Sequence, residues 1–194
     1  MPLLVRTVSR ATTALALVTA FLIPAVARGA PRPVPVTQEY DLKAALLLNF
    51  ARFVEWPAAA FASATTPIVI GILGDDPFGS TLDTLVAGET IRSRPLVIRR
   101  YSSVEQADGC HILFVSSSEG TRLGHIAEVL AHRSVLTVGD TKDFASRSGV
   151  IGFELVQRRL RLWINVAAAT DAQLTISSKL LRQAEIVRSR RSGG

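Results

Sequence analysis

The sequence predicts an α/β protein in which a mostly parallel sheet is flanked by helices on both faces and is followed by a C-terminal antiparallel hairpin and a final helix. Two observations predict the parallel sheet: continuous apolar, β-branched runs that suit strands buried on both faces, and helix-forming segments that separate these runs. A third observation, two strand-like segments joined by a tight turn after Gly149, predicts the hairpin.

The chain begins with the features of a secretory signal peptide. Arg6 and Arg10 precede an apolar run over residues 11–26, and Ala25-Val26-Ala27 forms an A-x-A cleavage site. The run is shorter than the roughly 20 residues that a membrane-spanning helix needs, although a retained signal anchor is the alternative. We therefore expect residues 1–27 to be removed on export to the periplasm.

The exported chain then divides into a linker, one domain and a tail. Residues 28–38 contain three spaced prolines and predict an extended linker. Residues 39–187 predict a single domain, and residues 188–194 a basic disordered tail. The net charge of +6 does not indicate nucleic-acid binding. Most of this charge lies in the signal peptide and near the tail, whereas a nucleic-acid-binding domain concentrates charge on a folded face.

Cys110 is the only cysteine of the chain, which excludes an intramolecular disulfide. Its place beside an apolar run predicts a small buried residue at the start of a strand. An intermolecular disulfide is the alternative.

The first element of the domain is predicted to be a helix over residues 39–56, which stops at Pro57. Leu48 lies outside its apolar stripe with no core to face, so we treat it as a candidate partner contact. The alternative is a single exposed apolar residue, which is common. The stripe itself consists of Leu42, Leu46, Leu47, Phe50, Phe53 and Val54.

Strands and helices alternate from residue 67 onward. Residues 67–74 predict a strand buried on both faces. Asp76 and Pro77 predict the N-cap and first position of a helix that ends near Gly88, and Ser118 is predicted to cap a later helix. The other elements of this region are strands at 96–98, 111–115 and 135–138 and a helix at 120–131.

A hairpin follows the alternating region. Residues 150–156 and 159–165 predict its two strands, and Gln157 and Arg158 predict a tight turn between them. A last helix is expected over residues 177–187.

The second hairpin strand carries the candidate partner-binding surface. Successive strand residues point to opposite faces, so its leucines and isoleucine suit the core. Arginine and tryptophan are enriched where protein interfaces carry their energy, and Arg161 is placed to stack on the Trp163 indole. The alternative is an amphipathic strand whose tryptophan is covered by the terminal helix. The outer face consists of Arg159, Arg161, Trp163 and Asn165.

Polar residues follow three of the predicted parallel strands. Asp75, Ser117 and Asp140 lie at the carboxyl ends of strands, where open α/β sheets bind small ligands, so a periplasmic small-molecule sensor is the alternative function. Asp76, Ser118 and Asp140 also stand where the following helices need N-caps, and we favour this structural explanation.

No pattern in the sequence indicates an enzyme, a cofactor or a metal site. The G-x-S-x-G, H-E-x-x-H and P-loop motifs do not occur. His125 and His132 are separated by about 10.5 Å along a helix, too far to share one metal ion. Cys110 and His111 are adjacent, so their side chains point to opposite faces of a strand. The sequence predicts a binding protein.

Ordered blocks at residues 39–57, 72–79, 110–116, 135–140, 165–169 and 174–181 together form a specific pattern. In these blocks the sequence resembles the YfiR family, and the resemblance covers nearly the whole exported chain. The resemblance implies a periplasmic regulator that binds the periplasmic domain of an inner-membrane diguanylate cyclase and holds it inactive, which lowers cyclic-di-GMP and restrains biofilm formation. It also implies a second partner, an outer-membrane lipoprotein of the peptidoglycan-binding type, which sequesters the repressor. We also expect a homodimer.

Two positions depart from the pattern of that family. Members can pair the cysteine at the position of Cys110 with a second cysteine in the first strand, but residues 68–74 contain none. Trp163 stands where the family often has an acidic residue. The resemblance therefore implies a partner contact of a different kind at this position, apolar or cation–π.

Overall fold

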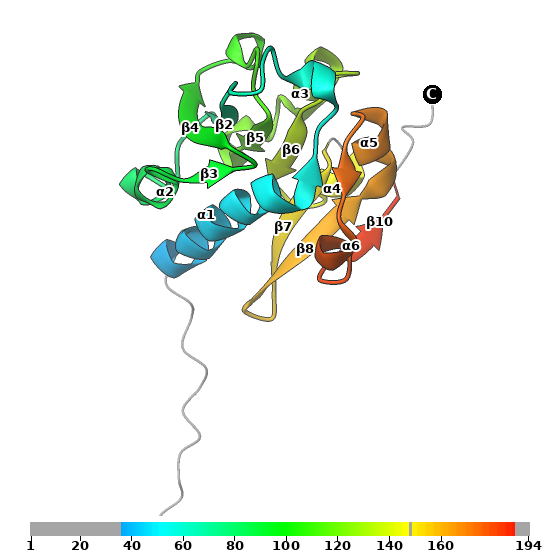
Figure 1. Ribbon diagram of the computed structural model, residues 1–194. Coiled ribbons are helices and arrows are strands. Elements are labelled where there is room, and N and C mark those ends of the chain that lie inside the picture. The colour runs from blue at the N-terminus through cyan, green and yellow to red at the C-terminus, as the bar shows by residue number, and fades with distance from the viewer. Residues whose placement is uncertain (1–35, 148, 189–194) are drawn as a thin grey trace, which may run out of the picture. The chain divides into compact units, whose positions relative to one another are not determined.

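An eight-stranded sheet runs through the part of the chain that the computed structural model describes, residues 36–147 and 149–188 (Figure 1). Neighbouring strands are parallel except in the pairs β7–β8 and β3–β4. This arrangement confirms the predicted fold class, including the C-terminal hairpin. The strand order is β10 (Glu185–Val187), β8 (Arg159–Asn165), β7 (Ile151–Val156), β6 (Leu136–Gly139), β5 (Ile112–Val115), β2 (Ile68–Leu73), β4 (Arg94–Tyr101) and β3 (Thr90–Ile91).

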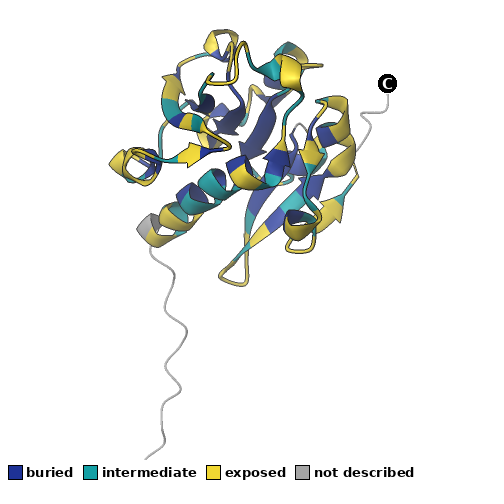
Figure 2. Cartoon of the chain, viewed as in Figure 1, coloured by how far each residue is buried: buried dark blue, intermediate teal, exposed yellow. Residues whose placement is uncertain are grey.

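Helices cover both faces of this sheet, as the sequence predicts. Side chains alternate along β2, so Ile70 and Ile72 face one layer, and Val69 and Leu73 face the other. Figure 2 shows the buried centre of the sheet, where β2, β5 and β6 are buried along their whole length. The first layer holds α1 (Val36–Phe53), α2 (Ser80–Val86), α5 (Val166–Asp171) and α6 (Ser178–Leu181), and the second holds α3 (Leu123–Val129), α4 (Phe144–Arg147) and the short 3-10 helix η2 (Val104–Gln106).

Shorter elements complete the described chain. A separate two-stranded sheet pairs β1 (Val54–Glu55) with β9 (Thr175–Ile176), and η1 (Ala58–Ala60) follows β1. Helix α1 begins inside the stretch that the sequence assigns to the linker. The predicted signal peptide, the rest of that linker and most of the predicted tail lie outside the described residues.

Helix α1 is buried over a wider arc than its apolar stripe predicts. Lys43 is 2% exposed and Leu48 packs against the core, whereas Leu42 is 49% exposed. Helix α1 contacts α2 as well as the sheet, and Asp140 after β6 lies against Lys43, so side chains outside the stripe are covered too. The predictions that Leu48 lacks a core to face and that Leu42 belongs to the buried stripe are therefore wrong.

Two predicted N-caps bind other backbone groups. Asp76 Oδ1 accepts a hydrogen bond from the N–H of Phe78 (2.8 Å), in a turn that precedes α2 rather than at its first residue. Ser118 lies within the 3-10 helix η3 (Ser117–Glu119), and its hydroxyl accepts a hydrogen bond from the N–H of Asp75 (3.0 Å). The loops that follow β2 and β5 are thus joined to each other, and α3 begins only after a further turn.

The final helix, α6, is shorter than predicted, because the chain after it forms a strand. Residues Glu185–Val187 make β10, which pairs in parallel with β8 and places Ile186 opposite Ile164. The free edge of β8 offers backbone hydrogen bonds to this β-branched segment. This pairing overrides the helical assignment of residues 182–187.

Candidate functional site

The hairpin of β7 and β8 carries most of the predicted partner-binding residues. The apolar side chains of β8 pack in the core, as predicted. On the opposite face, exposure falls along the strand, from exposed Arg159 and Arg161 through half-buried Trp163 to Asn165, which is 2% exposed. The far end of the predicted surface is therefore interior.

Asn165 has a structural role at the end of β8. Its Oδ1 accepts a hydrogen bond from the N–H of Ala168 (3.0 Å), which caps α5, and its Nδ2 donates to the carbonyl of Ala145 (2.9 Å). Because this side chain is buried and committed to two backbone groups, we remove Asn165 from the candidate partner-binding surface.

We expect the substitution Asn165→Ala to lower the free energy of unfolding by about 1–2 kcal/mol, because α5 loses its cap and the carbonyl of Ala145 loses a donor. Urea unfolding followed by tryptophan fluorescence measures this change. A variant that unfolds like the wild-type protein would contradict the structural role.

Trp163 lines a polar pocket beside α4, with a volume of about 290 Å³. Its indole Nε1–H is buried and has no hydrogen-bond partner among the described residues. Acidic and basic residues both line this pocket beside the indole. The other lining residues are Asp143, Ala145, Ser146, Glu154, Val187 and Arg188.

The elements around Trp163 differ from those that the sequence suggests. Helix α4 packs on this face of the sheet through Ala145. Strand β10 lies beside β8 in the same sheet, so the predicted terminal helix does not cover Trp163. The Arg161 guanidinium lies 3.9 Å from the Glu185 carboxylate. Within the described ranges, no cation–π contact joins Arg161 to Trp163. We call Arg159, Arg161 and Trp163 the hairpin surface.

The three candidate ligand residues do not share one pocket. Asp75 and Ser117 are exposed after β2 and β5, whereas Asp140, after β6, turns toward α1. Asp140 lines a pocket of about 330 Å³ together with Glu39 and Lys43, and neither Asp75 nor Ser117 lines it. The small-molecule hypothesis stays a prediction.

A buried ion cluster joins α1 to the end of β6. Lys43 Nζ lies 2.7 Å from Glu39 Oε1 and 2.8 Å from Asp140 Oδ2. Tyr40 donates its hydroxyl to the same Asp140 oxygen at 2.9 Å. The side chains of Lys43 and Asp140 are only 3% and 6% exposed. Burial raises the pKa of Tyr40 above its usual value, and the hydrogen bond to Asp140 adds a smaller increase.

Asp140 therefore anchors α1 instead of capping a helix. The sequence shows the Glu39–Lys43 spacing of one helical turn, which is typical of a surface ion pair. It does not show that Asp140, which lies 97 residues beyond Lys43, completes the cluster. Sequence reasoning missed this cluster because only the tertiary structure brings its members together.

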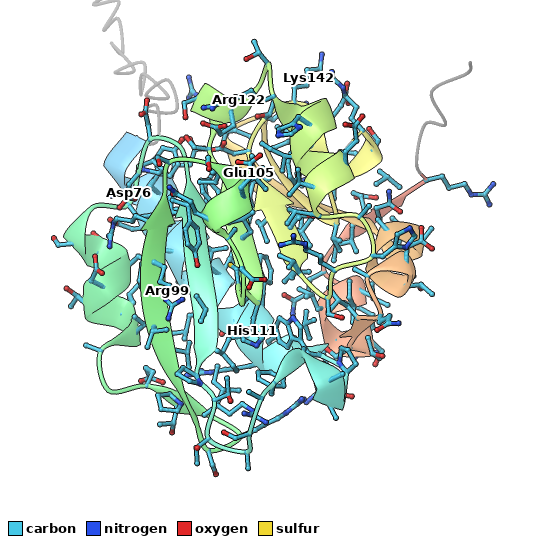
Figure 3. All side chains as sticks on the ribbon, turned by 90° about the horizontal axis from the view of Figure 1, so that it is seen from above. Asp76, Arg99, Glu105, His111, Arg122 and Lys142 are labelled. Atoms are coloured by element: carbon cyan, nitrogen blue, oxygen red, sulfur yellow. The ribbon has the colours of Figure 1, made fainter. Side chains whose placement is uncertain are left out.

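His111 is a buried neutral histidine before β5, at the opposite end of the sheet from Arg122 (Figure 3). Its Nδ1 accepts a hydrogen bond from the N–H of Val69 (3.1 Å), so the ring proton lies on Nε2, which donates to the carbonyl of Ala60 (3.2 Å). The ring stacks on Phe61. Burial lowers the pKa of His111, against the opposing effect of the hydrogen bond to Ala60.

We expect the protein to lose stability as the pH falls below about 6.5, the usual pKa of histidine. The pKa of His111 is lower in the folded chain than in the unfolded chain, so the unfolded state binds more protons in this range. The stabilisation that comes from burying neutral His111 is fully present above the pKa that this histidine has in the unfolded chain. It is lost as the pH falls toward the lower pKa of His111 in the folded chain. Urea unfolding across this range measures the slope, and His111→Gln is expected to flatten it. Equal slopes for the two proteins would contradict the prediction.

Cys110 is a small buried residue just before β5, as predicted. Its Sγ lies 3.0 Å from the carbonyl oxygen of Ile112, and burial raises the pKa of the thiol to about 12. A thiol that stays protonated is a poor nucleophile. The geometry therefore gives Cys110 a packing role.

Metal-binding clusters and membrane-spanning helices can be assessed in the described residues, 36–147 and 149–188. No group of three or more histidine, cysteine, aspartate and glutamate side chains in these ranges is arranged to hold a metal ion. No helix within them is both long enough and apolar enough to cross a membrane.

The structure is that of an α/β protein that presents a half-buried tryptophan and exposed arginines on one strand. Residues 40–185 match the family model described as YfiR/HmsC-like. The chain belongs to the YfiR/HmsC-like family, which confirms the resemblance seen in the sequence. Membership implies a periplasmic, non-catalytic regulator of diguanylate cyclase signalling. No curated protein matches the chain.

Proposed function

We propose that this protein represses an inner-membrane diguanylate cyclase by binding its periplasmic domain, which lowers cyclic-di-GMP and restrains biofilm formation. Membership in the YfiR/HmsC-like family is the observation that carries this proposal. The hairpin surface supports it, because exposed arginines beside a half-buried tryptophan match the residue types that dominate interface energies.

Repression in this scheme needs binding and no chemistry. The signal peptide delivers the chain to the periplasm, where it acts as a homodimer that holds the cyclase inactive. An outer-membrane, peptidoglycan-binding lipoprotein relieves repression by sequestering the protein. Both interactions are reversible, so the level of cyclic-di-GMP falls as the fraction of cyclase bound by the repressor rises.

The experiment that tests the function is removal of the gene from its host, followed by measurement of intracellular cyclic-di-GMP and of biofilm mass. We expect both to rise, and to return to the parental level when the gene is supplied again. Removal of the membrane cyclase should abolish the rise. Unchanged cyclic-di-GMP in the strain that lacks the gene would refute the proposed function.

Charge reversal on the hairpin surface is expected to weaken repression. Arg159→Glu with Arg161→Glu places two negative charges where the partner meets positive ones, so cyclic-di-GMP should rise toward the level of the strain without the gene. Trp163→Ala is expected to act in the same direction. The matched control is Arg133→Glu, an exposed arginine before β6 at the other end of the parallel strands. If the hairpin variants repress as well as this control, the hairpin surface is not the contact.

A further inference from the structure

The tip of the β7–β8 hairpin stands clear of the sheet. Among the described residues, β7 pairs with β6 through Ile151 and Gly152 alone, and β8 pairs with β10 from Trp163 to Asn165. Beyond these points the two strands pair with each other, down to Val156 opposite Arg159. Figure 1 shows the resulting ribbon extending past the neighbouring strands. We call residues 155–159 the ribbon tip.

The ribbon tip combines uncovered apolar and cationic side chains. Leu155 and Val156 are 49% and 40% exposed. Arg158 and Arg159 are exposed, and in the described part of the chain no ion pair engages either of them. The sequence has no acidic residue from Leu155 through Leu162. Positive charge therefore lies next to aliphatic surface at the tip. The nearest acidic residue of the ribbon is Glu154, which lies opposite Arg161 and accepts a hydrogen bond from the N–H of Asp143.

The fold does not require the residues at the turn. Gln157 and Arg158 have φ angles of 49° and 62°. Two-residue hairpin turns with positive φ at both positions favour Asn-Gly, because other side chains strain the left-handed backbone. The turn would be more stable with that pair, so the turn geometry does not account for an arginine there.

We propose that the ribbon tip inserts into a groove with an acidic floor and apolar walls on the periplasmic domain of the cyclase, an inference that rests on the proposed function. Arginine pairs with carboxylates through two parallel hydrogen bonds. Arg158 and Arg159 contact the acidic floor of the groove. Leu155 and Val156 lie behind them on opposite faces of the ribbon and contact the apolar walls.

The arrangement of the tip favours a protein groove over a lipid surface. Leu155 and Val156 are consecutive, so they point to opposite faces of the ribbon, and the turn beyond them is polar. Insertion into a bilayer would drive Gln157 and Arg158 into hydrocarbon ahead of the aliphatic side chains. A groove with two walls contacts both faces of the ribbon at once.

The test removes the arginine while improving the turn. The double substitution Gln157→Asn with Arg158→Gly should raise the melting temperature and yet weaken repression, so loss of folding cannot explain the effect. The chain offers a matched control in the turn between β3 and β4, where Arg92 and Ser93 have φ angles of 52° and 65°. Arg92→Asn with Ser93→Gly relieves the same backbone strain but gives up the exposed ion pair of Arg92 with Glu55, so its melting temperature should stay at or above the wild-type value. It should leave repression unchanged.

Binding is measured with the purified periplasmic domain of the membrane cyclase whose output rises when the gene is removed. The ribbon-tip variant should bind it about tenfold more weakly, the factor that corresponds to about 1.4 kcal/mol. A photo-crosslinker at position 157 should join the wild-type protein to an acidic segment of that domain.

The outcomes separate the two proposals. If removal of the gene leaves cyclic-di-GMP unchanged, the proposed function is wrong, and so is the proposed insertion of the ribbon tip. If removal raises cyclic-di-GMP but the ribbon-tip variant represses and binds like the control, only this inference is overturned. Co-sedimentation of the wild-type protein, but not of the variant, with vesicles of phosphatidylglycerol and phosphatidylethanolamine would also overturn it, in favour of a membrane contact.

Discussion

Replacing Lys43 by alanine is expected to lower the free energy of unfolding by about 3–5 kcal/mol, the usual cost of removing one partner from a buried ion pair. Lys43 is the cation between Glu39 and Asp140, and its loss leaves the Asp140 carboxylate buried with the Tyr40 hydroxyl as its remaining partner. The other Asp140 oxygen, Oδ1, already lacks a partner among the described residues. Urea unfolding followed by tryptophan fluorescence measures the loss.

Two controls show whether burial of the charge causes this loss. Arg92→Ala breaks an exposed ion pair with Glu55 and is expected to cost less than about 1 kcal/mol. Lys43→Met combined with Asp140→Leu removes both charges and keeps apolar volume, so it should recover most of the stability. A Lys43→Ala variant as stable as Arg92→Ala would show that the cluster does not hold α1 in place.

Phe144→Ala is expected to lower the free energy of unfolding by about 3–5 kcal/mol, as is typical for removal of a buried aromatic ring. Phe144 is 1% exposed and connects the short helix α4 to the sheet. Its ring fills the space in which Gly139 and Gly149 have no side chain, since a Cβ at either position would collide with it. We expect the variant to keep a cavity, because neither glycine has a side chain that could fill the space of the ring.

The same substitution should alter the surroundings of Trp163, because α4 covers that face of β8. We expect acrylamide to quench tryptophan fluorescence more strongly in Phe144→Ala than in the wild-type protein. Leu85→Ala on α2 is the control, since Leu85 is 36% exposed and surface substitutions usually change stability by less than about 0.5 kcal/mol. Equal stability of the two variants would contradict a role for Phe144 in holding α4.

The parts of the fold that the sequence predicts well are those with strong local patterns. The strand over residues 67–74 and the hairpin strands show their hydrophobic periodicity directly, and the structure places β2, β7 and β8 there. The final helix was predicted too long because residues 182–187 have no local pattern that excludes a helix. The edge of β8, supplied by a distant part of the chain, makes residues 185–187 a strand.

Local patterns also predict part of the candidate partner-binding surface. Period-two alternation places Arg159, Arg161 and Trp163 on one face, and the structure agrees. Alternation does not reveal that α4 covers one end of that face, so Asn165 was placed on a surface from which it is excluded. Leu48 was misplaced in a similar way, since a helical stripe shows one buried face and not the neighbouring α2.

The sequence by itself determined the α/β class, the order of most elements and the family, because these depend on short-range periodicity and on blocks of residues that can be recognised along the chain. Only the tertiary structure decided that Lys43 and Asp140 form a buried pair, that Asn165 is interior and that the ribbon tip stands free. Burial and charge pairing depend on which distant segments of the chain pack against a residue. The local sequence around that residue does not indicate which segments these are.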